Sequence, residues 1–425
     1  MFDIKLIREN PELVRQGLTN KNEPEKVGAI LQLDDERRKL IFATDELKSK
    51  KNAVSAQVGI LKKSGGDASA IIAETKTLSE KIATNDVLLK EIESKFEELL
   101  AALPNLPHSS VPVGKSAADN IEARQWIPEG FSFKYEGTAL DHIQLGKKHD
   151  ILDFERGAKI SGSGFPLYKG KGATLERALI NFMIDTHINQ HDYTEIFPPF
   201  LVNKESMFGT GQLPKMQDDM YYMERDDLYL IPTAEVPLTN IYRGEILPEA
   251  QLPIKFVGYS ACFRREAGSY GKDSKGFLRV HQFNKVEMVK FVKPEDSYDE
   301  LEKLVLDAED ILKALNVPYR ILSLCTGDLS FSAAKCYDIE TWSPAEDKWL
   351  EASSCSNFEA FQGRRANIRF RNEATKKLEF VHTLNGSGLA TSRLMVSLLE
   401  NNQTADGKIL IPKVLHKYTG FESIG

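Results

Sequence analysis

The strongest hydrophobic pattern lies in the N-terminal quarter of the chain. Mostly apolar positions recur at alternating steps of three and four residues from Ile30 to Leu61, and again from Ile71 to Leu103. This is heptad spacing, which predicts long helices that pack along one seam. The segment Ser64-Gly65-Gly66-Asp67 separates the two series, and so short a connection predicts an antiparallel hairpin. Helices of about 35 residues would each be about 50 Å long, so we expect an extended arm.

The pattern changes after a proline-rich segment. Pro104, Pro107 and Pro112 end the second helix, which predicts a first domain of residues 1–108 and a second of residues 109–425. In the second part, alternating segments predict antiparallel strands, and amphipathic segments predict helices between them. The clearest strands are expected near 255–259, 285–291 and 377–382, and the helices near 173–190, 295–315 and 388–401. The expected fold class is α+β.

Composition narrows the class of protein. The 425 residues are 41% hydrophobic and 28% charged, as in ordinary globular proteins, and no apolar run reaches signal-peptide or membrane-spanning length. We therefore expect a cytosolic protein without a membrane partner. The four cysteines, none in a C-x-x-C pair, argue against a disulfide framework and a thiolate zinc cluster.

Charge is distributed unevenly along the predicted arm. The net formal charge of the chain is −7, which gives no general reason to expect nucleic-acid binding. Between Lys48 and Lys81, however, seven lysines stand against three acidic residues, a local balance of +4. A basic distal arm suits a phosphate backbone. A solvated coiled-coil surface and a protein-binding arm are the alternatives that charge alone leaves open.

The densest group of chemically active residues lies in the second part. Phe263-Arg264-Arg265-Glu266 is followed by a glycine-rich stretch, 267–276, then by Arg279-Val280-His281-Gln282-Phe283 and Glu287. This predicts two strands joined by a loop, with Arg264 and Glu266 on a shared face, and likewise Arg279, His281 and Phe283. Guanidinium groups suit phosphate oxygens, and an aromatic ring can stack on a base.

These residues resemble motif 2 of the class II aminoacyl-tRNA synthetases, and segments similar to the two companion motifs are present. Asp192-Tyr193-Thr194-Glu195-Ile196-Phe197-Pro198-Pro199 is similar to motif 1, a dimerisation element that ends at Pro199. Asn385-Gly386-Ser387-Gly388-Leu389-Ala390-Thr391-Ser392-Arg393 is similar to motif 3, which delivers an arginine to the active site. Asp192 and Ser392 stand where many relatives carry glycine.

The order of arm and motifs resembles the bacterial-type seryl-tRNA synthetase family over essentially the whole chain. The resemblance implies an antiparallel sheet of six or seven strands flanked by helices, in a homodimer formed through motif 1. It implies an enzyme that activates L-serine with ATP and transfers it to serine tRNA, whose long variable arm the helical hairpin grips. It leaves open whether selenocysteine tRNA is also charged. It implies Mg²⁺ with the ATP and no zinc.

The resemblance also implies roles for particular residues. The expected serine contacts are Thr233, Ala234, Glu235, Glu287 and Ser387. The expected ATP contacts are Arg264, Arg265, Glu266, Val280, Phe283, Glu351, Ala352, Ser353, Ser354 and Arg393. Among these, Arg264 and Arg393 are the expected catalytic residues, and Glu351 and Ser354 the expected Mg²⁺ ligands.

Other interpretations remain at this point. A non-catalytic paralogue could use the same dimer and coiled coil as a binding module, although the intact motif residues argue against it. A ligase that charges a carrier protein would lack the long hairpin, and a zinc-dependent archaeal-type seryl enzyme is disfavoured by the missing cysteine cluster. His187 and His191 have helical i,i+4 spacing but lack the glutamate of a zinc protease. They are expected to be solvated or capping.

Overall fold

The computed structural model describes residues 2–133, 135, 139–266 and 275–425. Contacts between residues divide the chain into two units. The first consists of residues 1–19 and 23–104, and the second of residues 20–22 and 105–425. The glycine-rich stretch predicted to link the motif 2 strands lies outside the described residues between 267 and 274.

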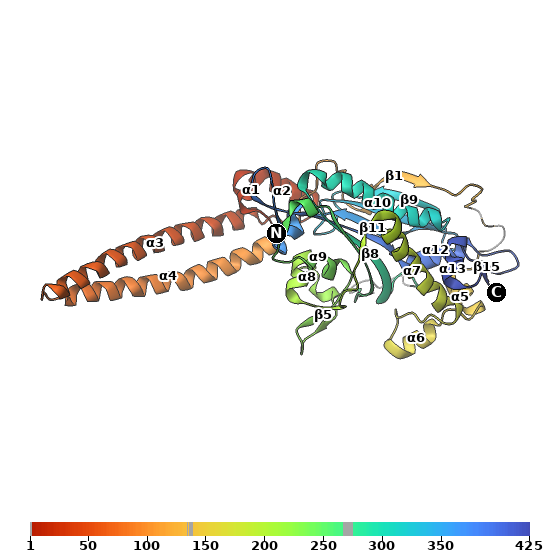
Figure 1. The fold of residues 1–425 in the computed structure, drawn as a ribbon, viewed down its shortest axis with the longest axis horizontal. Coiled ribbons are helices and arrows are strands. Elements are labelled where there is room, and N and C mark those ends of the chain that lie inside the picture. Colours follow the sequence, from red (N-terminus) through yellow and green to blue (C-terminus); the bar gives the residue numbers. More distant parts are fainter. Residues whose placement is uncertain (1, 134, 136–138, 267–274) are drawn as a thin grey trace. The chain divides into compact units, whose positions relative to one another are not determined.

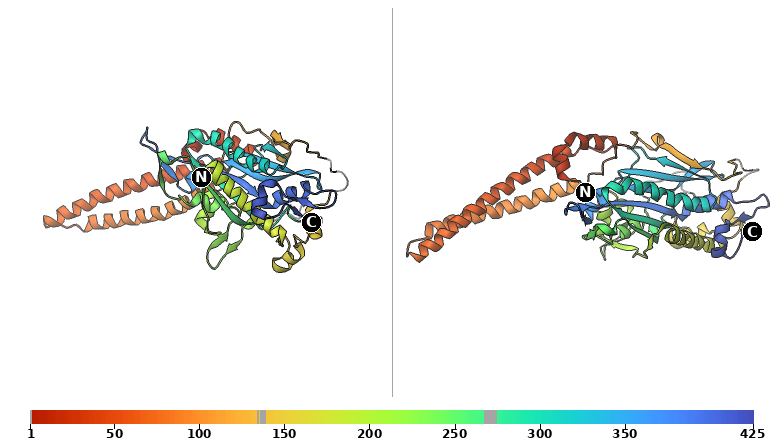
Figure 2. Two further views of the ribbon diagram at one scale, coloured as in Figure 1. Left: turned by 45° about the vertical axis from the view of Figure 1, so that its right-hand side comes forward. Right: turned by 45° about the horizontal axis from the view of Figure 1, so that its top comes forward.

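The first unit is helical, and its two long helices confirm the predicted hairpin. Its elements are α1 (Ile4–Glu9), α2 (Pro11–Asn20), α3 (Val27–Lys63) and α4 (Ser69–Ala101). Helices α3 and α4 lie side by side along their length (Figures 1 and 2). Gly65 takes a left-handed φ of +74°, and the amide of Gly66 donates to the Leu61 carbonyl oxygen, which ends α3. The seam is partly polar, because Asn85 Nδ2 donates to Thr44 Oγ1 at 3.0 Å.

The second unit is built on an eight-stranded sheet within the described residues. The strand order is β1, β9, β10, β11, β14, β8, β7, β2. Neighbours are antiparallel except β2 and β7, which are parallel. The expected α+β class is confirmed, and in the described part of the chain the seven strands from β1 to β7 in this order each run antiparallel to the next, as expected. The two-residue parallel strand β2 adds an eighth. The bounds are β1 (Ile121–Trp126), β2 (Thr194–Glu195), β7 (Ile254–Phe263), β8 (Gln282–Val292), β9 (Tyr319–Ser323), β10 (Lys335–Ser343), β11 (Lys348–Asn357) and β14 (His382–Ala390).

One face of this sheet carries the main apolar core. Strand side chains alternate between faces, and along β8 Val286 and Met288 are fully buried in this core. Helices α7 (Lys171–His191), α10 (Ser297–Ala314) and α12 (Thr391–Asn401) supply the other side of it. Figure 1 shows these three helices running beside the sheet. Lys285 and Glu287 alternate with the core residues and so point to the opposite face, where the cavity described below lies.

Shorter elements cover the remaining surfaces. The helices are α5 (His142–Lys148), α6 (Phe154–Ser161), α8 (Lys204–Thr210), α9 (Glu235–Asn240), α11 (Ala360–Arg365) and α13 (His416–Thr419), with single 3₁₀ turns at Ala117–Asp119, Gln217–Asp219, Glu249–Gln251, Pro294–Asp296 and Lys413–Leu415. The small sheets contain β3 (Leu201–Asn203), β4 (Tyr222–Met223), β5 (Leu228–Leu230), β6 (Ile246–Pro248), β12 (Arg369–Arg371), β13 (Leu378–Phe380), β15 (Ile409–Leu410) and β16 (Ser423–Ile424).

Two element boundaries in the structure differ from those that the sequence predicts. The segment 377–382 is divided between β13 and the start of β14, and the helix expected from residue 388 begins only at Thr391 because β14 runs to Ala390. Across the described ranges, no helix combines the length and apolar character needed to cross a membrane.

Candidate active site

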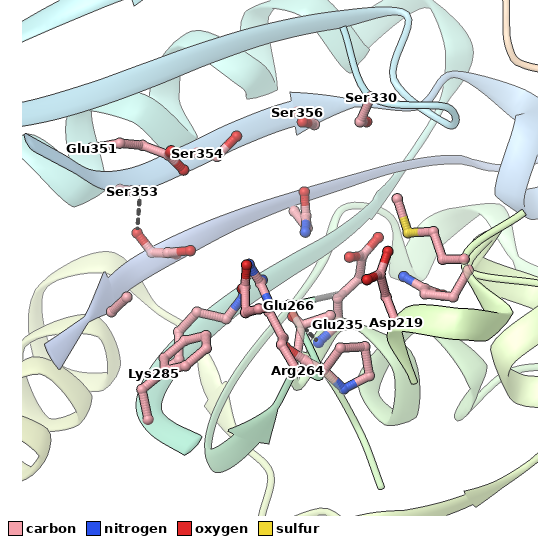
Figure 3. A pocket seen from close by; sticks show the side chains of 18 of the residues that line it. Asp219, Glu235, Arg264, Glu266, Lys285, Ser330, Glu351, Ser353, Ser354 and Ser356 are labelled. Carbon is pink, nitrogen blue, oxygen red and sulfur yellow. Dashed lines mark hydrogen bonds between the residues drawn. The ribbon is translucent and has the colours of Figure 1, made fainter. Parts of the chain in front are cut away.

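A cavity of about 620 Å³ opens on the sheet face opposite the main core. It gathers side chains from β8, β11 and β14, from the start of α12, from the segment that follows β7 and from the loops beside α8 and α9. Figure 3 labels ten of these side chains, including Arg264, Lys285 and Glu351. Most of the predicted site residues line it, namely Thr233, Glu235, Arg264, Glu266, Val280, Phe283, Glu351, Ala352, Ser353, Ser354, Ser387 and Arg393. Segments more than 150 residues apart in the chain therefore meet in one place.

Glu287 lies directly behind the wall of the cavity. Its side chain is fully buried, and Lys285 Nζ forms an ion pair with Glu287 Oε2 at 2.6 Å. Thr233 Oγ1 donates to Oε2 at 3.2 Å, and Asn385 Nδ2 donates to Oε1 at 3.0 Å. All three partners line the cavity, whereas Glu287 does not. The Glu287 carboxylate therefore orients three polar groups of the cavity wall.

Glu235 is a buried acidic side chain that lines the cavity. Burial raises the pKa of its carboxyl to about 7, and the nearby Glu287 adds to the rise. Its backbone amide donates to Thr233 Oγ1 at 3.1 Å, next to the start of α9. A carboxylate held this way can accept hydrogen bonds from an amino acid ligand.

Two predicted site residues lie away from the cavity. Ala234 is fully buried in a second apolar cluster beside Leu238 and Val289. The Arg265 side chain points away from the cavity, and its guanidinium carbon lies 5.9 Å from the centre of the Tyr221 ring. Its backbone amide donates to the Asp219 carbonyl oxygen at 3.0 Å. Neither residue lines the cavity.

The motif 2 strands end earlier than the sequence predicts. The ladder between β7 and β8 closes at Phe263 and Gln282, so Arg264 and Glu266 lie beyond it, and the predicted shared face does not apply to them. Glu266 adopts a left-handed φ of +51°, and its Oε2 accepts a hydrogen bond from Arg279 Nη1 at 2.7 Å. The guanidinium carbon of Arg264 lies 5.2 Å from the centre of the Phe283 ring.

His281 departs from the predicted face for the same reason. Its ring Nδ1 lies 2.9 Å from the Arg264 carbonyl oxygen, and the ring packs against Phe165 with centres 5.5 Å apart. His281 does not line the cavity, in contrast to Arg279 and Phe283. It supports the backbone that carries Arg264.

Motif 3 delivers its arginine by way of a bulge. The register between β14 and β8 shifts between Ser387 and Leu389, which leaves Gly388 as the extra residue. Arg393 follows in the first turn of α12 and donates from Nε to the Leu278 carbonyl oxygen at 3.2 Å. Its Nη1 lies 3.1 Å from Glu351 Oε2. The cation and the carboxylate therefore meet at one wall of the cavity.

A second bulge brings the two predicted metal ligands together. Ser353 pairs with Ile339 on β10, but Glu351 pairs with the very next residue, Glu340, so β11 carries Ala352 as an extra residue. Residues three apart on a regular strand point to opposite faces. The bulge instead places Glu351 and Ser354 on the same face, and both line the cavity (Figure 3).

The donor chemistry of these two residues suits Mg²⁺. A carboxylate and a hydroxyl are hard oxygen ligands, and Mg²⁺ often takes only one or two protein ligands beside water and phosphate. Within the described residues, no three or more histidine, cysteine, aspartate or glutamate side chains are grouped to bind a metal ion.

The interpretation of the two helical histidines was wrong. His187 is fully buried, and burial lowers the pKa of its ring to about 3. His187 Nε2 lies 3.3 Å from the carbonyl oxygen of Gly388, and its Nδ1 lies 3.0 Å from Nδ1 of His191. Rather than being solvated, the pair supports the motif 3 bulge from behind.

Sequence reasoning missed several residues of the cavity wall. Lys285, Asn385 and Asp219 all line it, and Lys285 and Asn385 contact Glu287 directly. The i,i+2 spacing of Lys285 and Glu287 on a predicted strand was a signal that places them on one face. Asn385 is the first residue of the segment similar to motif 3, which was a signal for its place near the site. The sequence carries no comparable signal for Asp219.

Comparison with known families agrees with this geometry. Residues 220–402 match the family described as the tRNA synthetase class II core domain (G, H, P, S and T), and residues 1–107 match the seryl-tRNA synthetase N-terminal domain. The serine–tRNA ligase of Chloroherpeton thalassium is 61% identical over 429 aligned positions, covering 100% of both chains. That of Chlorobium phaeovibrioides is 58% identical and covers 100% of this chain and 99% of its own.

Solved structures give the same result. A crystal structure of seryl-tRNA synthetase from Pyrococcus horikoshii complexed with ATP has a TM-score of 0.93 and 40% identity, covering 100% of this chain and 99% of that one. The sheet, the cavity and the core match define a class II aminoacyl-tRNA synthetase. Within that class, the N-terminal match and the full-length relatives show that the chain belongs to the seryl-tRNA synthetase family.

Proposed function

We propose that this cavity activates L-serine with ATP, and that the chain then transfers the seryl group to the 3′ end of serine tRNA. The observation that carries the proposal is the meeting of two arginines, an oriented carboxylate network and an aromatic ring in one cavity. As a member of its family the chain is a serine–tRNA ligase. The test is serine-dependent exchange between ATP and pyrophosphate, followed by charging of serine tRNA.

In the first step, a serine carboxylate oxygen attacks the α-phosphorus of ATP, and the bond to pyrophosphate breaks. Such transfer needs positioning and charge stabilisation more than proton transfer. We assign Arg264 to the serine carboxylate and α-phosphate, and Arg393 to the outer phosphates, since both guanidinium groups line the cavity. In the second step, the terminal ribose hydroxyl of the tRNA attacks the carbonyl carbon and releases AMP.

We assign the remaining residues according to their chemistry. We assign the Phe283 ring to stacking on adenine, and Glu266 and Val280 to contacts beside it. Arg265 adds positive charge near ATP from outside the cavity wall. Glu235 and Thr233 receive the serine ammonium and hydroxyl, Ser387 lies beside them, and Glu287 acts through Thr233. Ala234 contributes by packing under this site.

We propose Glu351 and Ser354 as the residues that hold Mg²⁺, with Ala352 and Ser353 shaping the strand between them. When bound, the ion neutralises phosphate charge. Replacing Glu351 with glutamine is expected to raise the Mg²⁺ concentration that gives half-maximal exchange by roughly tenfold or more, because a neutral amide binds the ion more weakly. The measurement is a Mg²⁺ titration of exchange at saturating ATP and serine.

The matched control is Glu340→Gln. Glu340 lies opposite Glu351 in the ladder but is bonded to Arg320 at 2.6 Å and does not line the cavity. Its replacement should leave the Mg²⁺ requirement unchanged. An unchanged requirement in Glu351→Gln would remove Glu351 from the metal site.

We propose that residues 1–108 form a tRNA-binding domain and residues 109–425 the catalytic domain of a cytoplasmic enzyme. The helical hairpin supports a contact with the long variable arm of serine tRNA, because its distal part carries the local excess of lysine. A selenocysteine tRNA with a similar long variable arm would bind through the same contact and would then be charged with serine. No zinc enters this proposal.

We propose that motif 1 forms a homodimer interface. Strand β2 is an edge of the sheet, and the Phe197 side chain beyond it is 76% exposed. A hollow of about 430 Å³ next to it is lined by α7 residues and by Glu195, Phe197 and Tyr259. An open sheet edge beside exposed aromatic surface favours pairing with a second copy.

Replacing Phe197 with aspartate is expected to raise the dimer dissociation constant by roughly tenfold or more, because a large apolar side chain would lose its burial. Sedimentation velocity over a concentration series measures this constant. The control is Ile121→Asp, which alters an exposed apolar side chain on β1 at the opposite edge of the sheet. Equal dimer dissociation constants for the two variants would show that Phe197, and with it motif 1, is not at the dimer interface.

A further inference from the structure

A fully buried glutamine lies one contact behind the serine site. Gln362 is on α11, has no exposed surface and does not line the cavity. We propose that Gln362 is a positioning residue that fixes which oxygen of Glu235 is presented to serine. The inference rests on the proposed serine-binding role of Glu235 and adds a residue that acts only through it.

Three hydrogen bonds fix the Gln362 amide. Nε2 donates to Glu235 Oε1 at 2.7 Å and to the Thr210 carbonyl oxygen at 3.2 Å, and Oε1 accepts from Thr383 Oγ1 at 2.7 Å. A carbonyl oxygen can only accept a hydrogen bond. The contact with Thr210 therefore places the nitrogen, not the oxygen, on the side of Glu235, and the amide must donate to the carboxyl group.

The frame around this amide is rigid. Thr210 ends α8, Thr383 is in β14, and both side chains are buried at 1% exposure or less. The Thr210 carbonyl oxygen also accepts from Ser332 Oγ at 3.1 Å. Because α8 and β14 both hold the Gln362 amide on α11, its donor position is fixed by the fold.

This arrangement makes the two oxygens of Glu235 different. Oε1 is engaged by Gln362 as an acceptor, which leaves Oε2 for a ligand in the cavity that Glu235 lines. The same asymmetry directs any proton to Oε2, and burial holds the pKa of Glu235 at about 7. The charged groups that act on this carboxyl are Glu287, Lys285 and Arg264. Serine would thus meet one defined acceptor oxygen.

The direct test is Gln362→Met, which keeps the side-chain length and removes the donor. The KM for serine in ATP–pyrophosphate exchange is expected to rise about tenfold or more, as for a lost hydrogen bond to a charged group. The KM for ATP and kcat at saturating serine should stay within about twofold. Losing a donor also disfavours the ionised form, so the midpoint of the pH profile of kcat/KM for serine should move to higher pH.

Two isosteric threonine variants separate positioning from packing. Thr383→Val removes the hydroxyl that anchors Gln362 and should raise the serine KM in the same direction. Thr239→Val removes a buried hydroxyl that has no hydrogen-bond partner among the residues that the structure describes, and it should leave both KM values and the pH midpoint unchanged. If circular dichroism shows that Gln362→Met is unfolded, Thr383→Val provides the test, with the serine KM and the pH midpoint as the two measurements.

The outcomes are distinct. An unchanged serine KM and pH midpoint in the folded variants would overturn the role of Gln362 while leaving serine activation intact. Equal rises in the KM values for serine and ATP, without a shift in the pH midpoint, would also overturn it, since they indicate general disruption. Absence of serine-dependent exchange in the unaltered protein would instead overturn the proposed function.

Discussion

Replacing Arg264 with alanine is expected to lower serine-dependent ATP–pyrophosphate exchange roughly 10²–10³-fold, the cost of removing one preorganised charge-stabilising group. Arg264 lies just beyond the β7–β8 ladder, and its backbone amide is held by the His281 carbonyl oxygen at 2.9 Å. The side chain faces the cavity beside Phe283. Because the guanidinium is placed before ATP binds, its loss should reduce kcat more than it raises either KM.

Two further variants show whether the loss of exchange in Arg264→Ala is specific to the Arg264 guanidinium. Arg264→Lys keeps the charge but not the planar fork, and should recover only part of the lost rate. Arg225→Ala changes an exposed arginine in the turn between β4 and β5, outside the cavity, and should exchange at the original rate. Arg264→Ala exchange at the original rate would disprove the assignment.

Shortening the helical hairpin is expected to separate the two steps of the reaction. The contact between Thr44 and Asn85 joins α3 and α4 part of the way along the hairpin. Residues 46–83 can therefore be replaced by the natural turn sequence alone, Ser-Gly-Gly-Asp, with that contact retained. Charging of serine tRNA should fall by roughly 10²-fold or more, because the distal lysine contacts with phosphate are lost. Exchange should stay within about twofold, since the cavity is built from residues of the second unit.

The measurement is a charging assay and an exchange assay on the same preparation, with circular dichroism to show that the shortened hairpin stays helical. A full-length variant with Lys48, Lys50 and Lys51 changed to alanine is the matched control for charge. It should weaken tRNA binding and flatten its dependence on salt. Undiminished charging by the shortened protein would rule out the hairpin as a tRNA contact.

Patterns local in the sequence predicted most of the fold. The heptad series between Ile30 and Leu103 led directly to α3 and α4, because both partners of a helical hairpin lie in one continuous segment. The alternating pattern at 285–291 led likewise to β8. The edge strand β1 was missed because so short a segment carries little periodicity.

The site was predicted less completely, for a physical reason. Its wall depends on contacts between distant segments, such as Asn385 with Glu287, 98 positions apart, and Gln362 with Glu235, 127 positions apart. The bulge at Ala352 determines that Glu351 and Ser354 share a face, yet nothing in the local sequence indicates it. Family motifs could name Glu287 but not show that it lies behind Thr233, Lys285 and Asn385.

The central claim is tested most directly by ATP–pyrophosphate exchange with the purified chain, run with serine, alanine, threonine, glycine and cysteine in parallel. Serine should support exchange, and alanine should be rejected by roughly 10⁴-fold, as in sites built to bond a substrate hydroxyl. Threonine should fail because a serine site must exclude its extra methyl group by steric contact. Exchange at equal rates with alanine, or no exchange with any of the five, would contradict a serine-activating site.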